Sequence, residues 1–173
     1  MAHFVLTVSG ADRPGLVSAI SAAVNAHGGS WEHSQLSQLA GRFAGIVLVS
    51  VPDGEDDGLV VDLVALEAQG ISVSVERTDE PAEEETEPVT YDLELVGADR
   101  PGIIAEISAL LAAHGVSIED LVTELVDAPM AGGLLFEARA VLVAPESASA
   151  EALREALEEL ADRLMVDVHL TLE

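Results

Sequence analysis

The residues best suited to chemistry lie in a short motif, Gly-Ala-Asp-Arg-Pro-Gly, that occurs twice in the chain. It spans residues 10–15 and again 97–102. If a helix begins at this motif, its free N–H groups and the positive end of its dipole favour a carboxylate. The final glycine of each copy leaves those N–H groups open, and Arg13 or Arg100 adds a charged contact to the same anion. The motif therefore predicts an anion-binding loop, although a plain turn with its arginine in solvent explains the same residues.

The motif also predicts how the chain turns from a strand into a helix. Asp12 and Asp99 are good acceptors for capping a first helical turn. Pro14 and Pro101 fit that turn, where a missing N–H costs nothing. We therefore expect each aspartate to cap a helix that starts close behind it.

A second acidic segment, PDGEDDG at residues 52–58, resembles the start of a calcium loop through Asp53, Glu55 and Asp57. Val64 stands where a bidentate glutamate should close such a loop. We interpret the segment as an ordinary acidic turn.

The remaining candidate side chains favour structural roles. His27 and His114 each precede a helix-ending glycine, where an imidazolium favours the helix dipole, so we expect both to cap helices. Ser21 and Ser108 have no evident base beside them, which leaves a nucleophilic role unsupported. Trp31, at a strand start, is expected in the core.

Composition excludes several kinds of chemistry. The 173 residues contain no cysteine, and all seven basic residues are arginine, which excludes disulfides, thiolate ligands and lysine Schiff bases. A formal net charge of −25 opposes a phosphate backbone, so direct binding to nucleic acid is not expected. No apolar run reaches the roughly 18 residues of a membrane span. Residues 1–10 carry no leader, so we expect a cytoplasmic protein with no membrane partner. We find no clustered acid, base or metal set, and expect neither an enzyme nor a cofactor.

The two motifs belong to a longer internal repeat with an offset of 87 residues. Residues 10–28 and 97–115 share 12 of 19 positions without gaps. Residues 78–88, TDEPAEEETEP, carry six acidic residues and two prolines, a composition typical of an extended linker. We therefore predict a first module at 1–77, an acidic linker at 78–88 and a second module at 89–173.

Both modules show the same order of periodic patterns. The first predicts strands at 3–9, 30–39, 43–51 and 71–75, a helix ended by Gly28, and a second helix at 58–69. The second predicts strands at 89–96, 117–126, 134–143 and 165–172, a helix ended by Gly115, and a second helix at 149–164. The order βαββαβ is typical of the ferredoxin-like α+β fold, an antiparallel sheet with both helices on one face. Such sheets leave edge strands bare, so we expect the modules to pair within one chain or in a homodimer.

Taken together, the repeat, the element order and the DRPG turn resemble those of ACT-domain proteins, small modules that bind amino acids and regulate metabolism. Two modules with no enzyme attached, and DAPMAGGLLF at 127–136, resemble more narrowly the glycine cleavage system transcriptional repressor group. The resemblance implies a ligand where modules meet, at the first strand-to-helix loop and the start of the second strand. The positions it implies are Asp12, Arg13, Gly15 and Ser30 in the first module, and Asp99, Arg100, Gly102, Ser117 and Asp120 in the second.

One departure from the family concerns the second strand. Many members that bind amino acids open it with asparagine, whereas this chain has Ser30 and Ser117. A hydroxyl offers fewer hydrogen bonds than an amide, so the identity of the ligand stays open.

Two functions follow from the resemblance. The first is a non-enzymatic regulator of amino-acid metabolism that senses an amino acid at the interface between modules and thereby changes a surface for a partner. The alternative is a ligand-independent interaction module that sequesters a transcription factor, through an open sheet edge or the loop at 127–133. The resemblance to the repressor group implies a transcription-factor partner in either case.

Overall fold

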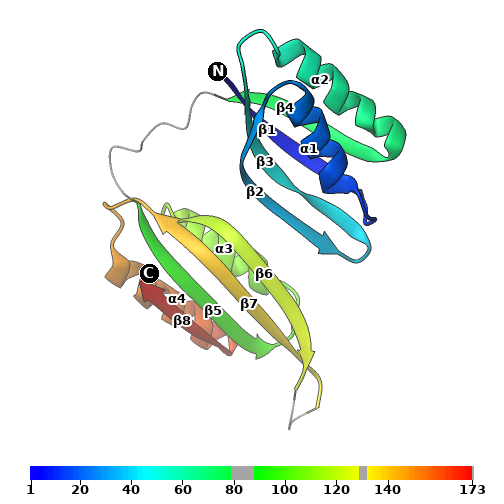
Figure 1. Ribbon diagram of the computed structural model, residues 1–173. Coiled ribbons are helices and arrows are strands. Elements are labelled where there is room, and N and C mark those ends of the chain that lie inside the picture. The colour runs from blue at the N-terminus through cyan, green and yellow to red at the C-terminus, as the bar shows by residue number, and fades with distance from the viewer. Residues whose placement is uncertain (79–87, 129–131, 173) are drawn as a thin grey trace. The chain divides into compact units, whose positions relative to one another are not determined.

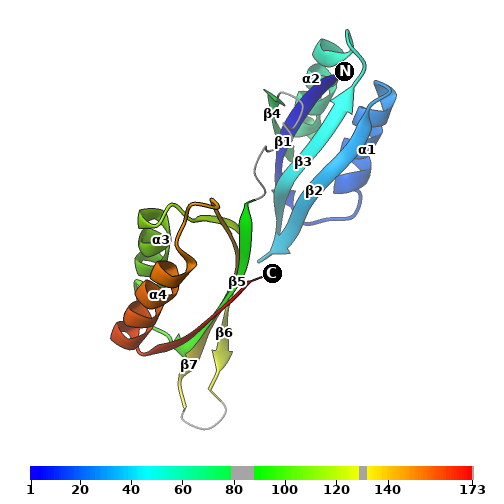
Figure 2. The same ribbon diagram turned by 90° about the vertical axis from the view of Figure 1, so that its left-hand side faces the viewer.

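In each half of the chain, an antiparallel sheet of four strands carries two α-helices on one face (Figures 1 and 2). The structure is a computed structural model that describes residues 1–78, 88–128 and 132–172. It divides into two compact units, Met1–Glu83 and Glu84–Glu173. Most of the expected linker, 78–88, lies outside the described residues, and its role stays a prediction.

The first module follows the order βαββαβ. Its elements are β1 (Ala2–Ala11), α1 (Leu16–Ala26), β2 (Ser30–Leu39), β3 (Arg42–Val51), α2 (Asp56–Ala65), the 3-10 helix η1 (Leu66–Gln69) and β4 (Ile71–Thr78). The sheet order is β2-β3-β1-β4, with every neighbouring pair antiparallel. The predicted helix at 58–69 is thus a shorter α-helix that tightens into a 3-10 turn.

The second module repeats this topology. Its elements are β5 (Val89–Ala98), α3 (Ile103–Ala113), β6 (Ser117–Asp127), β7 (Leu134–Ala144), α4 (Ala150–Leu164) and β8 (Val166–Leu172). The sheet order is β6-β7-β5-β8. Met165, the expected first residue of the last strand, instead ends α4 in a left-handed conformation with φ 54°. The α+β, ferredoxin-like class is confirmed for both modules.

Alternating burial explains why these segments form a sheet covered on one side. In β1, Phe4, Leu6 and Val8 are buried, whereas the residues between them are half-buried or exposed. Leu16 and Ile20 of α1 fall on one helical face and belong to the same buried cluster. A strand period of two and a helix period of 3.6 therefore place one apolar face of each element in a common core.

The second module has a separate core built in the same way. Leu93 and Leu95 of β5 and Leu142 of β7 pack with Ile107 of α3 and Leu157 of α4. None of these residues belongs to the buried cluster of the first module. Each module thus has its own source of stability.

Because the cores are separate, a core truncation should weaken one module and spare the other. Leu63→Ala in the first core, or Leu142→Ala in the second, should each cost about 2–5 kcal/mol of unfolding free energy. Amide hydrogen exchange should show loss of protection in the mutated module alone. Equal loss in both modules for either variant would contradict separate cores.

Candidate functional site

The first strand-to-helix loop is held at three points. The amide of Asp12 donates to the carbonyl of Gly41 (2.9 Å), which ties the loop to the β2–β3 turn. The guanidinium of Arg13 donates to the carbonyl of Gln69, at the end of η1. The amide of Ala19 donates to Gly15 (2.9 Å), which closes the first turn of α1. The loop is therefore pinned to both of its neighbours while its residues stay exposed.

Gly15 is the residue that leaves the start of α1 open. It is the N-cap residue, with φ 96°, a left-handed conformation that suits glycine. A Cβ built on it meets no atom within 4 Å. In the described part of the chain, no side chain caps this helix, so the first-turn N–H groups have no partner within the helix or from a capping side chain.

The expected capping role of the aspartates is wrong. Helices α1 and α3 begin at Leu16 and Ile103, and the residue before each start is a glycine. Asp12 lies three residues ahead of its N-cap, as does Asp99. The proline and glycine of the motif therefore form the turn itself and do not belong to the first helical turn.

The second loop has the same backbone but a different electrostatic partner. Gly102 also has φ 96°, and the amide of Asp99 donates to the carbonyl of Leu134 (3.0 Å). The carboxylate of Glu106 lies 3.9 Å from where a Cβ on Gly102 would stand. That carboxylate pairs with Arg100 (3.6 Å) and Arg163 (3.3 Å). An internal anion therefore already lies beside the start of α3.

The first loop has no equivalent of Glu106. The repeat offset places Ala19 at the matching position, and no acidic residue lies in the first turn of α1. Among the described residues, Arg13 has no carboxylate partner. The two loops thus share a shape, but only the first is free of an internal anion.

Each module separates the loop from the other residues of the expected site. Ser30 pairs with Ser50, which pairs with His3 at the opening of β1, whereas Gly15 follows the far end of that strand. Helix α1 runs back along the sheet between them (Figure 1). A rise of about 3.3 Å per strand residue puts the two ends roughly 25 Å apart. No single amino acid spans that distance within one module.

The second module separates its expected site in the same way. Ser117 pairs with Val143, and Val143 pairs with Thr90 near the start of β5. Ser117 therefore lies far from the loop at Asp99. Asp120 lines a hollow with Asp92 and Arg139. The structure therefore brings together Asp99, Arg100 and Gly102, and places Ser117 and Asp120 elsewhere.

A histidine between two carboxylates lies outside the expected site. His27 is the C-cap residue of α1, as predicted, and its side chain is 15% exposed. Its Nδ1 lies 3.0 Å from Glu55 Oε2, and its Nε2 lies 2.8 Å from Asp62 Oδ2. These hydrogen bonds, first that to Glu55 and then that to Asp62, raise the pKa of His27 above 6.5. When His27 is protonated, both of its nitrogens donate, so the imidazolium links the end of α1 to α2.

The corresponding histidine of the second module behaves differently. His114 is the C-cap residue of α3, as predicted, and its Nδ1 lies 2.9 Å from the carbonyl of Leu110. That contact lies within its own helix and fastens no second one. Trp31, expected in the core, is instead half-buried and packs against the edge of the first core.

The carboxylates of the acidic turn have separate partners. Glu55 contacts His27, whereas Asp56 accepts from the amide of Gly54 (3.1 Å) and from Arg77 (3.0 Å). The pKa of Asp56 is lowered, first by its own backbone amide and then by that of Gly54 and by Arg77. Within residues 1–78, 88–128 and 132–172, no group of three His, Asp or Glu side chains is placed to hold a metal. The same residues include no helix long and apolar enough to cross a bilayer.

Comparison with known proteins assigns the fold and the loop to one family. The model of the ACT domain matches residues 2–76 and again 93–171. The chain belongs to the ACT-domain family. Each ACT module contains one DRPG loop. Each module also has the βαββαβ order that the resemblance implied.

Three relatives cover both ACT modules. The glycine cleavage system transcriptional repressor of Escherichia coli K12 is 27% identical over 165 residues, which cover 94% of this chain and 85% of that protein. A crystal structure of a protein of unknown function from Galdieria sulphuraria is 30% identical, with TM-score 0.87 over 99% of this chain and 98% of that one. A crystal structure assigned provisionally to the same repressor group shares the fold, with TM-score 0.72, 19% identity and coverage of 99% and 97%. The predicted resemblance to the repressor group is confirmed.

Two features of the site were missed by the sequence analysis. Glu106 was detectable, because the repeat aligns it with Ala19 and a charge difference at a repeated site is visible in the sequence. The His27 cluster had no such signal, since its partners lie 28 and 35 residues away. The loop proposed for partner binding, 127–133, includes residues outside the described part of the chain.

The His27 clamp predicts a pH dependence for the first module. Because the folded pKa is raised, the stabilisation is fully present below pH 6.5 and is lost as the pH rises through the higher folded value. NMR titration of the His27 ring should give a pKa above 6.5, and Asp62→Asn should lower it. The melting temperature of His27→Gln should depend less on pH above 6.5 than that of the wild type. A wild-type pKa at or below 6.5 would exclude the clamp.

Proposed function

We propose that this ACT-domain protein is a non-enzymatic regulator that senses an amino acid through the first DRPG loop. The observation that carries the proposal is the open start of α1, where uncapped N–H groups lie beside Gly15 and the unneutralised Arg13. Outward N–H groups at a helix start attract a carboxylate, and an arginine adds a charge-assisted hydrogen bond. The α-carboxylate of an amino acid supplies that anion.

The difference between the loops supports a division of roles. In the second loop, the Glu106 carboxylate lies beside Gly102 and is shared by Arg100 and Arg163. A ligand carboxylate arriving there meets like charge within a few ångströms, which disfavours binding. We therefore propose that the first loop is the sensing site and that the second is filled by the protein itself.

The serine of a second module completes the proposed site. Ser30, Ser117 and Asp120 lie at the sheet end opposite their own loops, so they reach a ligand only from another module. A hydroxyl donates one hydrogen bond and accepts up to two, and a carboxylate attracts an ammonium group. A ligand held in this way fixes how two modules pair, within one chain or between two chains. If the ligand binds one pairing of modules more tightly than another, ligand binding changes the population of the two pairings and so regulates the protein.

Relatedness to a transcriptional repressor supports the regulatory part of the proposal. The Escherichia coli relative is a repressor of the glycine cleavage system, and it shares both modules with this chain. We propose that a transcription factor is the partner, because the −25 charge of this chain disfavours direct contact with DNA. The alternative, sequestration of that factor without a ligand, predicts no amino-acid binding at all.

Calorimetry on exchanged residues tests the proposed site. The wild-type protein should bind glycine or serine, and Ala19→Glu should weaken binding by at least about tenfold because it copies the internal anion of the second module. Gly15→Asp should do the same, since it places a carboxylate and a Cβ in the open turn.

The matched variant is Glu106→Ala, which removes the internal anion and should leave the first site unchanged or add a second one. Circular dichroism must show that each variant is folded. Tight binding that survives both Ala19→Glu and Gly15→Asp would exclude the first loop as the site. No binding by the wild type to a panel of amino acids would favour the ligand-independent alternative.

A further inference from the structure

Helix α2 of the first module carries apolar side chains on two opposite faces. Its inner face packs in the core through Leu59 and Leu63, followed by Leu66 at the start of η1. Because a helix turns about 100° per residue, Val61 and Val64 face away from that core. They are 66% and 50% exposed. Two large apolar side chains therefore lie on the solvent side of this helix.

The two valines begin a longer apolar stripe. It continues through Ala65, the last residue of α2, and Ala68 of η1, and both are exposed. The spacing i, i+3, i+4 and i+7 from Val61 is that of one helical face. We call these four residues the α2 stripe. Single apolar residues are ordinary on a protein surface, whereas a helix that is apolar on opposite faces is typical of one covered on both.

The corresponding helix of the second module shows what this face carries when water covers it. We align the two helices by their buried leucines, which are Leu59, Leu63 and Leu66 in the first module and Leu153, Leu157 and Leu160 in α4. Every position of the α2 stripe then corresponds to an exposed carboxylate of α4, namely Glu155, Glu158, Glu159 and Asp162. Glutamate also favours an exposed helix more than valine does. Neither solvation nor helix stability explains the two valines.

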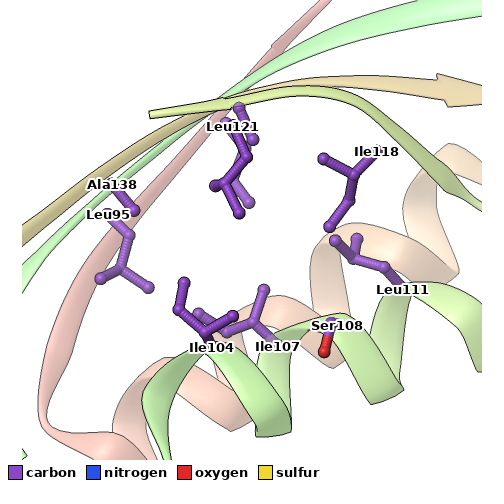
Figure 3. A pocket seen from close by; sticks show the side chains of 10 residues that line it. Leu95, Ile104, Ile107, Ser108, Leu111, Ile118, Leu121 and Ala138 are labelled. Carbon is purple, nitrogen blue, oxygen red and sulfur yellow. The ribbon is translucent and has the colours of Figure 1, made fainter. Parts of the chain in front are cut away.

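The exposed apolar side chains of the second module are covered differently. Ile118 and Leu121 of β6 are 37% and 41% exposed, but both point toward α3 (Figure 3). There they line a small apolar cavity of about 20 Å³ together with Ile104 and Ile107. These strand residues thus pack within their own module. The α2 stripe remains exposed to solvent over the described part of the chain.

The charges around the α2 stripe define what can cover it. Asp57 and Glu67 are exposed near its two ends, and none of the residues of α1, α2 and η1 is lysine or arginine. The nearby His27 already contacts Glu55 and Asp62. A second copy of the stripe would bring like carboxylates together without a cation, which opposes self-association. A partner with lysine or arginine opposite Asp57 and Glu67 gains from the same charges.

We propose that the α2 stripe binds an amphipathic, basic helix of a partner protein. The apolar residues of that helix recur at helical spacing and pack on Val61 and Val64, and its flanking lysine or arginine side chains pair with Asp57 and Glu67. The stripe shares no residue with the amino-acid site proposed above, so either proposal can fail without the other.

Fluorescence anisotropy with designed peptides tests the proposal on the full chain. The probe is the labelled peptide KLAKKLAKLAKKLAK, whose leucines fall on one helical face, at physiological ionic strength. The comparison peptides are ELAEELAELAEELAE and a peptide with the composition of the probe but with its leucines spread around the helix. We expect saturable binding of the probe, and at least about tenfold weaker binding of the other two. The acidic peptide lacks charge complementarity, and the other has no apolar face.

Three variants locate the binding. Val61→Glu and Val64→Glu, which copy the residues of α4, should each weaken binding of the probe by at least about tenfold. Val122→Glu, the same change at a 52% exposed valine of β6, should change it less than about twofold. Each variant adds one negative charge, so attraction of the cationic probe by net charge alone would strengthen binding in all three. The melting temperature of each variant checks that it is folded.

Three outcomes would overturn this inference. One is the absence of saturable binding of the probe by the wild-type chain. Another is unchanged or stronger binding by Val61→Glu and Val64→Glu, or equal binding of the probe and the peptide with spread leucines, which indicates attraction by charge alone. The third is sedimentation of the wild type as a dimer that Val61→Glu separates, which makes a second copy the occupant of the stripe.

Discussion

The left-handed backbone at Gly15 and Gly102 is the constraint on which both modules depend. With φ 96° at each position, the chain leaves the first strand and enters a helix that runs back along the sheet. The returning helix sends the next strand to the sheet edge, which gives the order β2-β3-β1-β4 and its repeat. The same glycine stands where a capping side chain otherwise would, so the helix start is left open to an external anion.

Because this loop is duplicated, the two modules can be compared at equivalent positions. Ala19 and Glu106 occupy one position in the repeat, and the change from methyl to carboxylate places an acidic group beside the second loop that the first loop lacks. Trp31 and Ile118 differ at another repeated position, and the indole of Trp31 packs against the first core. The two modules therefore share one backbone but differ in the side chains placed on it.

Much of the fold was predictable because local patterns agree with the tertiary structure. Strand β2 was predicted with its observed bounds, Ser30–Leu39, and helices α1 and α3 end just before Gly28 and Gly115 as expected. Such patterns depend on the periods of strands and helices and need no knowledge of distant contacts. The repeated motif likewise located the loop.

The remaining features depend on contacts that no local pattern encodes. The N-cap role of Gly15 requires its φ angle, and the shift of register before Asp120 decides which face Leu121 takes. The separation of Ser30 from the loop follows only from the sheet register. Residue types predicted an anion-binding loop, which stays a prediction, whereas the separation of Ser30 and Ser117 from that loop required the structure.

Amide chemical shifts measured during a titration with glycine, and then with serine, show whether the first loop senses the ligand. The amides of Leu16, Val17 and Ser18 should shift with ligand, because they are the uncapped N–H groups at the start of α1. The amides of Ile103, Ile104 and Ala105 should remain unchanged beside Glu106. Equal shifts in both helices, or shifts in the second alone, would contradict the assignment of sensing to the first loop.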